Sequence, residues 1–164
     1  MPRTGLWLAV VLLGGAIVTP ARATTIRRMG LDEIVSHADT IVEARVTSVR
    51  SFWQGRKVLT EIGLSVTRSY KGSPGPSLTF QQLGGRVTAP VPLTMTVPGA
   101  PIHQVGDEGF YFLQPGTPGQ HLLVGLERGL VRIRHDDRGP FVQVEGHRRT
   151  PAELGERLRA IVAG

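Results

Sequence analysis

Cysteine is absent from the 164 residues of this chain. The absence excludes a disulfide framework, a thiolate metal site and a cysteine nucleophile. It also excludes the lipid-bearing cysteine with which a bacterial lipoprotein begins. Hydrophobic residues make up 40% and charged residues 20%, a balance that favours a globular domain over a disordered chain. The length leaves room for one domain rather than two.

The sequence also lacks the short motifs of common catalytic and cofactor sites. It contains no Gly-x-Ser-x-Gly elbow, no phosphate-binding P-loop and no Gly-x-Gly-x-x-Gly fingerprint. Two adjacent acidic pairs occur, Asp107-Glu108 and Asp136-Asp137. Neighbours in a strand point to opposite faces, so neither pair makes a glycosidase-type dyad by itself. We therefore expect no enzyme, no catalytic residue and no cofactor.

The histidines do not follow a metal-binding spacing. None of them stands in an H-x-x-x-H, H-x-H or H-E-x-x-H pattern. The five are His37, His103, His121, His135 and His147. A site assembled from distant strands, for example by His135, Asp136 and His147, remains open. It supports an alternative, a periplasmic enzyme or metal-binding protein that uses scattered His and Asp. For these residues we nevertheless expect ordinary surface histidines beside a hairpin turn, and we expect no metal.

Residues 1–23 have the composition of a secretory signal. A basic start precedes an apolar run over residues 6–18, and a small-x-small triplet ends at Ala23. The run is shorter than the roughly 20 apolar residues that a membrane span needs. We expect cleavage after Ala23 and export by the general secretory route to the periplasm or the medium. The product is then one domain over residues 24–164 with no stable membrane anchor.

The charge of the chain does not point to nucleic acid. Removing the signal takes away Arg3 and Arg22 and lowers the formal net charge from +6 to +4. A protein that reads nucleic acid gathers its basic residues together with exposed aromatic ones. Here the basic residues are scattered along the chain, so we expect no nucleic-acid partner. We expect the protein to be a monomer.

Hydrophobic periodicity predicts a helix and then strands in the first half of the chain. Residues 30–38 carry one apolar stripe at helical spacing. Residues 40–49 alternate, and residues 57–70 alternate over a length that exceeds an ordinary strand. Residues 51–56 between them predict a hairpin connection with Gly55 as its turn residue.

A long irregular segment follows a predicted strand at residues 77–83. Proline and glycine recur between residues 84 and 109, and a connection of this length is usually functional or disordered. Within it, Pro followed by Gly predicts a type II turn over residues 97–101. A rigid segment of this kind loses little entropy on binding, so it suits the display of a binding surface. The candidate partner-binding residues here are Val97, Pro98, Gly99, Ala100 and Pro101; the open alternative is that the loop only covers one end of the barrel.

The second half predicts short strands and a final helix. An apolar run at residues 110–113 predicts a central strand, and strands are expected at 121–124, 129–134 and 141–144. A capping box with Pro151 at the first helical position predicts a helix to about residue 163. The fold class is therefore mainly β. We expect a small OB-type barrel of five to seven antiparallel strands with a short N-terminal helix and a C-terminal helix.

Three short segments resemble the netrin-like domain, and especially the N-terminal domain of tissue inhibitors of metalloproteinases. They are Ala-Asp-Thr-Ile-Val-Glu-Ala-Arg-Val at residues 38–46, Ser-Tyr-Lys-Gly at residues 69–72 and Gly-Asp-Glu at residues 106–108. The chain also resembles bacterial exported proteins with a Val-Pro-Gly-Ala-Pro loop. The first resemblance implies an OB-type barrel and a protease partner bound through the N-terminus, where Thr24 and Thr25 are the matching residues. In those inhibitors a disulfide-bonded cysteine chelates the protease zinc, and this chain has no such cysteine.

These observations favour an exported, non-enzymatic binding module. It would bind or inhibit a secreted protease or another envelope protein. The periplasmic enzyme or metal-binding protein is the alternative.

Overall fold

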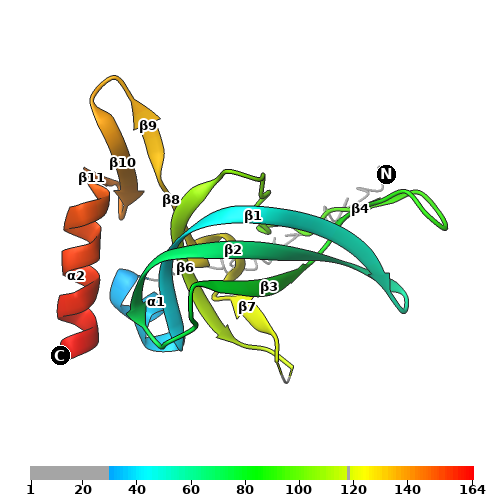
Figure 1. Cartoon of the computed structure of the whole chain (residues 1–164), viewed down its shortest axis with the longest axis horizontal. Coiled ribbons are helices and arrows are strands. Elements are labelled where there is room, and N and C mark those ends of the chain that lie inside the picture. Colours follow the sequence, from blue (N-terminus) through cyan, green and yellow to red (C-terminus); the bar gives the residue numbers. More distant parts are fainter. Residues whose placement is uncertain (1–29, 118) are drawn as a thin grey trace, which may run out of the picture.

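The computed structural model describes residues 30–117 and 119–164, and the signal predicted for residues 1–23 lies outside them. The described chain is mainly β with two helices, α1 (Leu31–His37) and α2 (Pro151–Ala163). Figure 1 shows the helices together at one end of the molecule, and a long hairpin that extends past the barrel at the other. The mainly β fold with flanking helices is thereby confirmed. Neither described helix is both long and apolar enough to cross a bilayer.

The first three strands form an antiparallel meander. They are β1 (Thr40–Gln54), β2 (Lys57–Lys71) and β3 (Ser77–Leu83). The connection predicted at residues 51–56 is too long, because Phe52 and Trp53 pair with Leu59 and Val58 as strand residues. Only two residues separate the strands, and the first of them, Gly55, has a φ of 59°. Glycine adopts this conformation without the steric cost of a side chain.

Strands from later in the chain complete the main sheet. Strand β6 (Glu108–Pro115) pairs with β1, β7 (His121–Leu123) and β8 (Leu130–Arg132). The main sheet has the order β3-β2-β1-β6-β7, and its two outer strands β3 and β7 contact each other. No ladder joins β3 to β7 within residues 30–117 and 119–164, so the sheet is a partly open barrel. This agrees with the OB-type barrel expected from the sequence.

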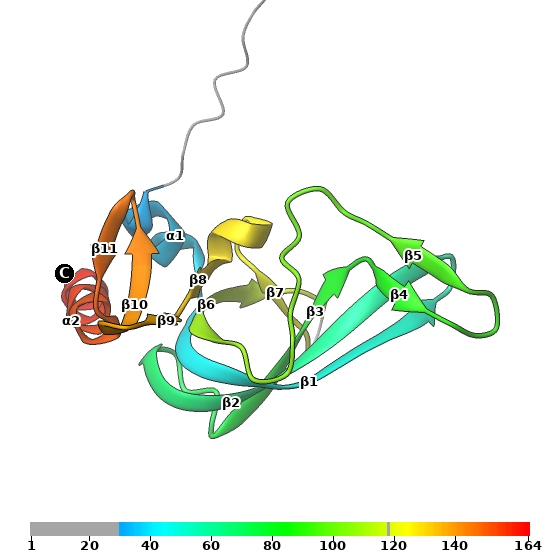
Figure 2. The same cartoon turned by 90° about the horizontal axis from the view of Figure 1, so that it is seen from above.

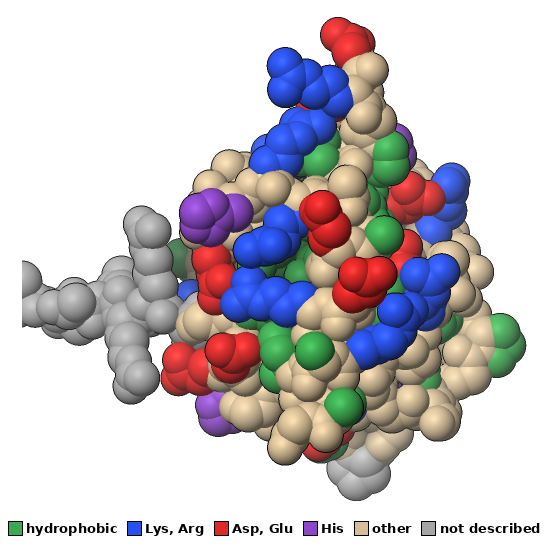
Figure 3. All heavy atoms as spheres, turned by 90° about the vertical axis from the view of Figure 1, so that its left-hand side faces the viewer, with side chains coloured by type: hydrophobic (Ala, Val, Ile, Leu, Met, Phe, Trp, Pro, Cys, Tyr) green, Lys and Arg blue, Asp and Glu red, His purple; other side chains and the backbone are tan. Residues whose placement is uncertain are grey.

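The end that carries the helices is built from α1 and from residues 126–163. A 3-10 helix η1 (Leu126–Gly129) leads through β8 to a small sheet of β9 (Arg134–Asp136), β10 (Gly139–Val144) and β11 (His147–Arg149). Strand β11 was not expected from the sequence. The capping box of α2 is confirmed: Thr150 Oγ1 accepts from Glu153 N at 3.2 Å, and Thr150 N donates to Glu153 Oε2 at 2.8 Å. Figure 3 shows acidic and basic side chains interspersed on this end.

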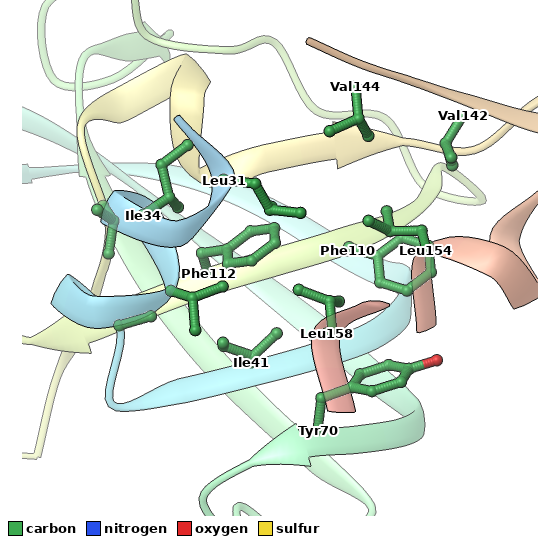
Figure 4. Close-up of a cluster of buried hydrophobic side chains, with 13 residues drawn as sticks. Leu31, Ile34, Ile41, Tyr70, Phe110, Phe112, Val142, Val144, Leu154 and Leu158 are labelled. Atoms are coloured by element: carbon green, nitrogen blue, oxygen red, sulfur yellow. The ribbon is translucent and has the colours of Figure 1, made fainter. Parts of the chain in front are cut away.

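Two clusters of apolar side chains share the central strand β6. Phe110 and Phe112 pack with the helices, whereas Tyr111 and Leu113 point into the barrel. Figure 4 shows Leu154 and Leu158 of α2 and Leu31 of α1 against the same cluster as Phe110 and Phe112. Both faces of β6 are therefore buried, which explains why its sequence is a continuous apolar run rather than an alternation.

The segment from residue 84 to residue 109 is more regular than its prolines predict. It contains a two-stranded ribbon of β4 (Gly85–Val87) and β5 (Leu93–Met95), paired from Gly85 opposite Met95 to Val87 opposite Leu93. The four prolines lie outside both strands, so they do not remove ladder donors. The expectation of an irregular connection was wrong at these six positions. Figure 2 shows this ribbon beside the far end of β1 and β2.

Candidate functional site

A groove of about 370 Å³ lies where the ribbon, the end of β3 and the loop after β5 meet the long hairpin. Its walls come from segments far apart in the sequence. The lining side chains are mostly aliphatic or small, with Arg86 as the only formally charged one. They are Val49, Ser51, Thr60, Gln82, Leu83, Gly84, Gly85, Arg86, Thr94, Met95, Thr96, Val97, Ala100, Pro101, Ile102 and His103. A concave, mainly apolar site with a few polar groups is the usual form of a binding site.

Hydroxyl groups fix the ribbon wall of the groove to the hairpin. The buried Thr60 Oγ1 donates to the carbonyl of Gly84 at 2.7 Å, and it lies 2.8 Å from Ser51 Oγ. Gly85 follows with a φ of 136°, and a Cβ there would collide with these two hydroxyl oxygens. The ribbon can therefore approach the hairpin this closely only because residue 85 has no side chain.

The loop after β5 contains the type II turn that its sequence predicts. Ala100 N donates to the carbonyl of Val97 at 3.0 Å, and Gly99 between them has a φ of 77°. The carbonyl of Gly99 accepts from Glu127 N at 2.9 Å, which ties the turn to η1. Gln82 Nε2 donates to the carbonyl of Pro101 at 2.9 Å. The turn is thus held from both sides in one conformation.

Beyond the turn, His103 packs against two aromatic rings of the barrel core, Phe80 and Tyr111, which also contact each other. Its ring lies edge-on to Phe80, with centroids 5.3 Å apart, and 6.1 Å from the ring of Tyr111. Its Nε2 lies 3.2 Å from Gln82 Oε1, while Nδ1 and the hydroxyl of Tyr111 are buried without a partner among the described residues. Burial lowers the pKa of His103 to about 4; Arg132 adds to this shift and Asp107 opposes it. Burial likewise raises the pKa of Tyr111. The imidazole is therefore neutral at neutral pH and covers the aromatic side chains of the barrel core.

The loop residues predicted from the sequence divide into two groups. Val97, Ala100 and Pro101 line the groove. Pro98 and Gly99 do not, because the tip of the turn is directed to η1, where Leu126 lies 3.8 Å from the Cβ that residue 99 would carry. The loop both covers the barrel, through His103, and forms a wall of the groove. The predicted residues Thr24 and Thr25 lie outside the described residues.

Sequence reasoning missed the residues that expose apolar surface at the groove. Ile102 is 79% exposed and Leu83 is 41% exposed, and both line the groove together with Val49. Two signals in the sequence mark this region. Residues 44–106 contain a single acidic residue, Glu61, and most of their large aliphatic residues after position 87 stand between prolines. A segment that combines apolar residues with so few acids is a poor solvated surface.

The alternative site at the other end of the molecule does not come together. Asp136 is held by Arg148, whose Nη1 and Nη2 lie 2.7 Å and 2.9 Å from its carboxylate oxygens. His135 Nε2 lies 3.9 Å from Glu108 Oε2 instead of facing Asp136. Within the described part of the chain, no three His, Asp or Glu side chains are grouped closely enough to hold a metal ion. The expectation of an ordinary hairpin turn here agrees with this arrangement.

A second, larger hollow of about 600 Å³ lies between α1, η1 and the turn from β10 to β11. Glu145 on its rim accepts from Leu31 N at 3.0 Å through Oε1 and from Arg157 Nη1 at 2.9 Å through Oε2. These bonds lower the pKa of Glu145, the bond from Leu31 more than the one from Arg157. Glu145 is thus engaged in joining α1 to α2. We take the groove beside the ribbon as the candidate site because Ile102 and Leu83 are exposed on its walls.

The function has to be argued from the groove itself. The netrin-like resemblance stays a prediction, and so does the role of Thr24 that it implies. Comparisons of this chain with protein-family models, with curated proteins and with solved structures found no match.

Proposed function

We propose that this chain is an exported, non-enzymatic binding module that holds a segment of another exported protein in the groove. A secreted protease or an envelope protein is the class of partner that this proposal addresses. The carrying observation is the exposure of Ile102 and Leu83 on the walls of a concave, largely apolar site. Exposed aliphatic side chains at a formed groove are a common mark of an interaction site.

The walls of the groove are held in place before any partner arrives. The hydrogen bonds from Thr60 to Gly84, from Gln82 to Pro101 and from Glu127 to Gly99 fix the three segments that meet there. A site that is already ordered loses less conformational entropy on binding than a flexible loop does. This supports binding through shape and apolar contact, with Arg86 as the one charged group available to orient the partner.

Site-specific photo-crosslinking tests the proposal. A benzophenone side chain replaces Ile102 at the rim of the groove, and the protein is produced in the cells from which the sequence comes. We expect one discrete adduct with an exported protein, which mass spectrometry identifies. The same side chain at Val162 on α2, which is 37% exposed, serves as the matched control and should give no such adduct.

A second substitution connects the adduct to the groove. Leu83→Arg places a charge on the apolar wall and should abolish the adduct at position 102, whereas Val162→Arg should leave it intact. Purified partner and module should then form a complex that Leu83→Arg weakens. The proposal is wrong if position 102 gives no adduct, or if positions 102 and 162 give the same ones.

A further inference from the structure

Two loop tips extend together from the barrel, at the end opposite the helices. One is the turn between β1 and β2, at residues 55–56; the other is the turn between β4 and β5, at residues 88–92. Figures 1 and 2 both show the two tips at the same end of the molecule, away from the helices and apart from each other. Contacts of β4 with β1 and with β2 keep the ribbon against the hairpin.

The two tips carry apolar and cationic side chains. Val91 at the tip of the ribbon is 62% exposed, and Leu93 is exposed beside it. Arg56 and Lys57 are exposed at the tip of the hairpin, and Phe52 and Trp53 are half-buried behind them. Glu61 is the only acid in residues 44–106, and its carboxylate lies 4.0 Å from Arg50. The tips therefore present hydrophobic groups and positive charge with no acid of their own.

The charge of the whole chain is concentrated in this segment. Residues 44–106 contain seven basic residues and one acidic residue, a formal charge of +6 that equals the net charge of the entire chain. The seven are Arg45, Arg50, Arg56, Lys57, Arg68, Lys71 and Arg86. Residues 107–164 contain eight basic and eight acidic residues. Of these seven, Arg56, Lys57 and Arg86 lie at or near the tips, whereas Lys71 bonds the carbonyl of Val35 in α1 and Arg45 and Arg68 face Glu108 and Glu43. The positive charge available to the tips is therefore that of Arg56, Lys57 and Arg86.

We propose that the two tips bind reversibly to the surface of an anionic lipid bilayer. Val91 and Leu93 enter the boundary between headgroups and acyl chains, and Arg56, Lys57 and Arg86 face the anionic headgroups. Interfacial binding has two parts: aliphatic side chains enter this boundary, and basic side chains are attracted to anionic headgroups. The contact is peripheral and involves no spanning segment. It differs from binding in the groove, because a flat surface meets protruding tips whereas a peptide segment fits a concave site; Arg86 is the one residue that both surfaces share.

The dimensions of the ribbon suit this arrangement. Arg86 stands opposite Thr94 in the ladder, and only Val87 separates it from the turn at residues 88–92 that forms the tip. The headgroup layer is about 5 to 8 Å thick on each side of the hydrocarbon core. When the tip reaches the hydrocarbon boundary, the flexible guanidinium of Arg86 can reach the phosphates while the barrel stays in water.

Vesicle co-sedimentation tests the proposal. The chain is taken from the exported fraction, its N-terminus is read by mass spectrometry, and it is mixed with vesicles of phosphatidylglycerol and phosphatidylcholine. We expect binding to these vesicles at low salt, release at high salt, and little binding to phosphatidylcholine alone, because attraction to charged headgroups falls off within a Debye length. Val91→Asp and the double variant Arg56→Glu/Lys57→Glu should each lower the affinity at least about tenfold.

Matched variants at the helix end distinguish this contact from nonspecific adsorption to vesicles. Val162→Asp and Arg134→Glu/Arg138→Glu change the same residue types on α2 and on the β9–β10 hairpin and should leave vesicle binding unchanged. Equal thermal midpoints show that all variants are folded. The proposal is overturned if vesicles do not bind, if phosphatidylcholine alone binds equally well, or if the control variants lose binding as much as the tip variants. Loss of the crosslinked adduct at position 102 in tip variants, without vesicle binding, would assign the tips to the protein partner instead.

Discussion

The molecule has a helix end (α1, α2 and residues 126–149) and a hairpin end (residues 49–60 and 83–105). The two ends differ in how far their side chains have partners within the chain. At the helix end, charges meet partners within the chain: Arg148 binds Asp136, and Arg157 binds Glu145. At the hairpin end, apolar groups face solvent. Of the eight exposed large hydrophobic residues in the described ranges, six lie there: Val49, Leu83, Val91, Leu93, Ile102 and Val105.

The difference shows which half has surface available for other molecules. The helix end uses its charges and its apolar stripe to hold α1 and α2 on the sheet. The hairpin end leaves aliphatic surface exposed, and Arg56, Lys57 and Arg86 have no acidic partner among the described residues, whereas Arg50 faces Glu61. Such surface costs stability and solubility unless something covers it. Both proposals therefore concern the hairpin end, one its groove and the other its tips.

The first prediction sets the two ends against each other in stability. Leu158→Ala removes a fully buried side chain from α2 and should cost about 3 kcal/mol or more of unfolding free energy, because a cavity remains. Leu93→Ala on the exposed ribbon should cost less than about 0.5 kcal/mol. Urea denaturation of both variants checks the contrast. Equal losses would show that the ribbon belongs to the stabilising core.

The second prediction concerns the loss of stability at acidic pH, and it tests His103, the buried histidine of the hairpin end. The unfolded chain protonates His103 near pH 6.5 and the folded chain only near pH 4, so the unfolded state binds more protons between these values. Stability is therefore retained above pH 6.5 and falls as the pH drops toward 4, by up to about 3 kcal/mol. Urea denaturation across this range should show that His103→Gln removes this part of the loss. His147→Gln at the helix end should retain this loss. If the unfolding free energy of both variants depended on pH in the same way, the assignment of the loss to His103 would be wrong.

The third prediction detaches the ribbon from the hairpin. Gly85→Ala adds a Cβ that collides with the hydroxyls of Ser51 and Thr60 and forces an unfavourable φ, so it should cost about 2 kcal/mol. Hydrogen exchange should accelerate in residues 85–95 and stay unchanged in α2. Gly106→Ala has a positive φ but open space around it, so it should cost about 1 kcal/mol from backbone strain alone. Matching losses would mean that close approach to the hairpin does not matter.

The smallest expected effect concerns the link between the two helices. Glu145→Gln removes the negative charge of the carboxylate that accepts hydrogen bonds from Leu31 N and from Arg157. The substitution should lower the free energy of unfolding by about 1 kcal/mol or less, because the side chain is partly exposed. The carboxylate pKa is lowered in the folded chain, so this contribution is present above the ordinary pKa of Glu and fades as acid protonates the group. Chemical denaturation near neutral pH checks the loss. Glu156→Gln, on α2 next to Arg157, is the control that should have no effect.

Local pattern predicted most of the elements. The capping box placed the start of α2 at the observed residue, and the Pro-Gly pair predicted the type II turn that Gly99 forms. The alternation over residues 57–70 predicted β2, and the apolar run at 110–113 predicted the central strand. These features depend on neighbours within a few residues, so their causes are present in the sequence itself.

Pairing between distant segments was harder to predict. The ribbon of β4 and β5 stands among prolines, and β11 has only three residues, so neither has a local pattern long enough to mark a strand. The groove depends on Thr60 meeting Gly84 and on Gln82 meeting Pro101, contacts that join residues 24 and 19 positions apart. Turn chemistry identified Val97, Ala100 and Pro101, but it did not indicate that Leu83 and Ile102 would face them.

By itself, the sequence determined that this is a cysteine-free chain with a mainly β domain, a capped final helix and a rigid proline turn. It also determined that residues 44–106 carry the whole net charge. Only the tertiary structure decided that Pro98 and Gly99 of the proline turn face η1 while the residues on either side line the groove. It also decided that the tips of the β1–β2 hairpin and the β4–β5 ribbon lie at the same end of the molecule. The physical reason is range: backbone preferences act over a few residues, whereas burial and strand pairing select partners from the entire chain.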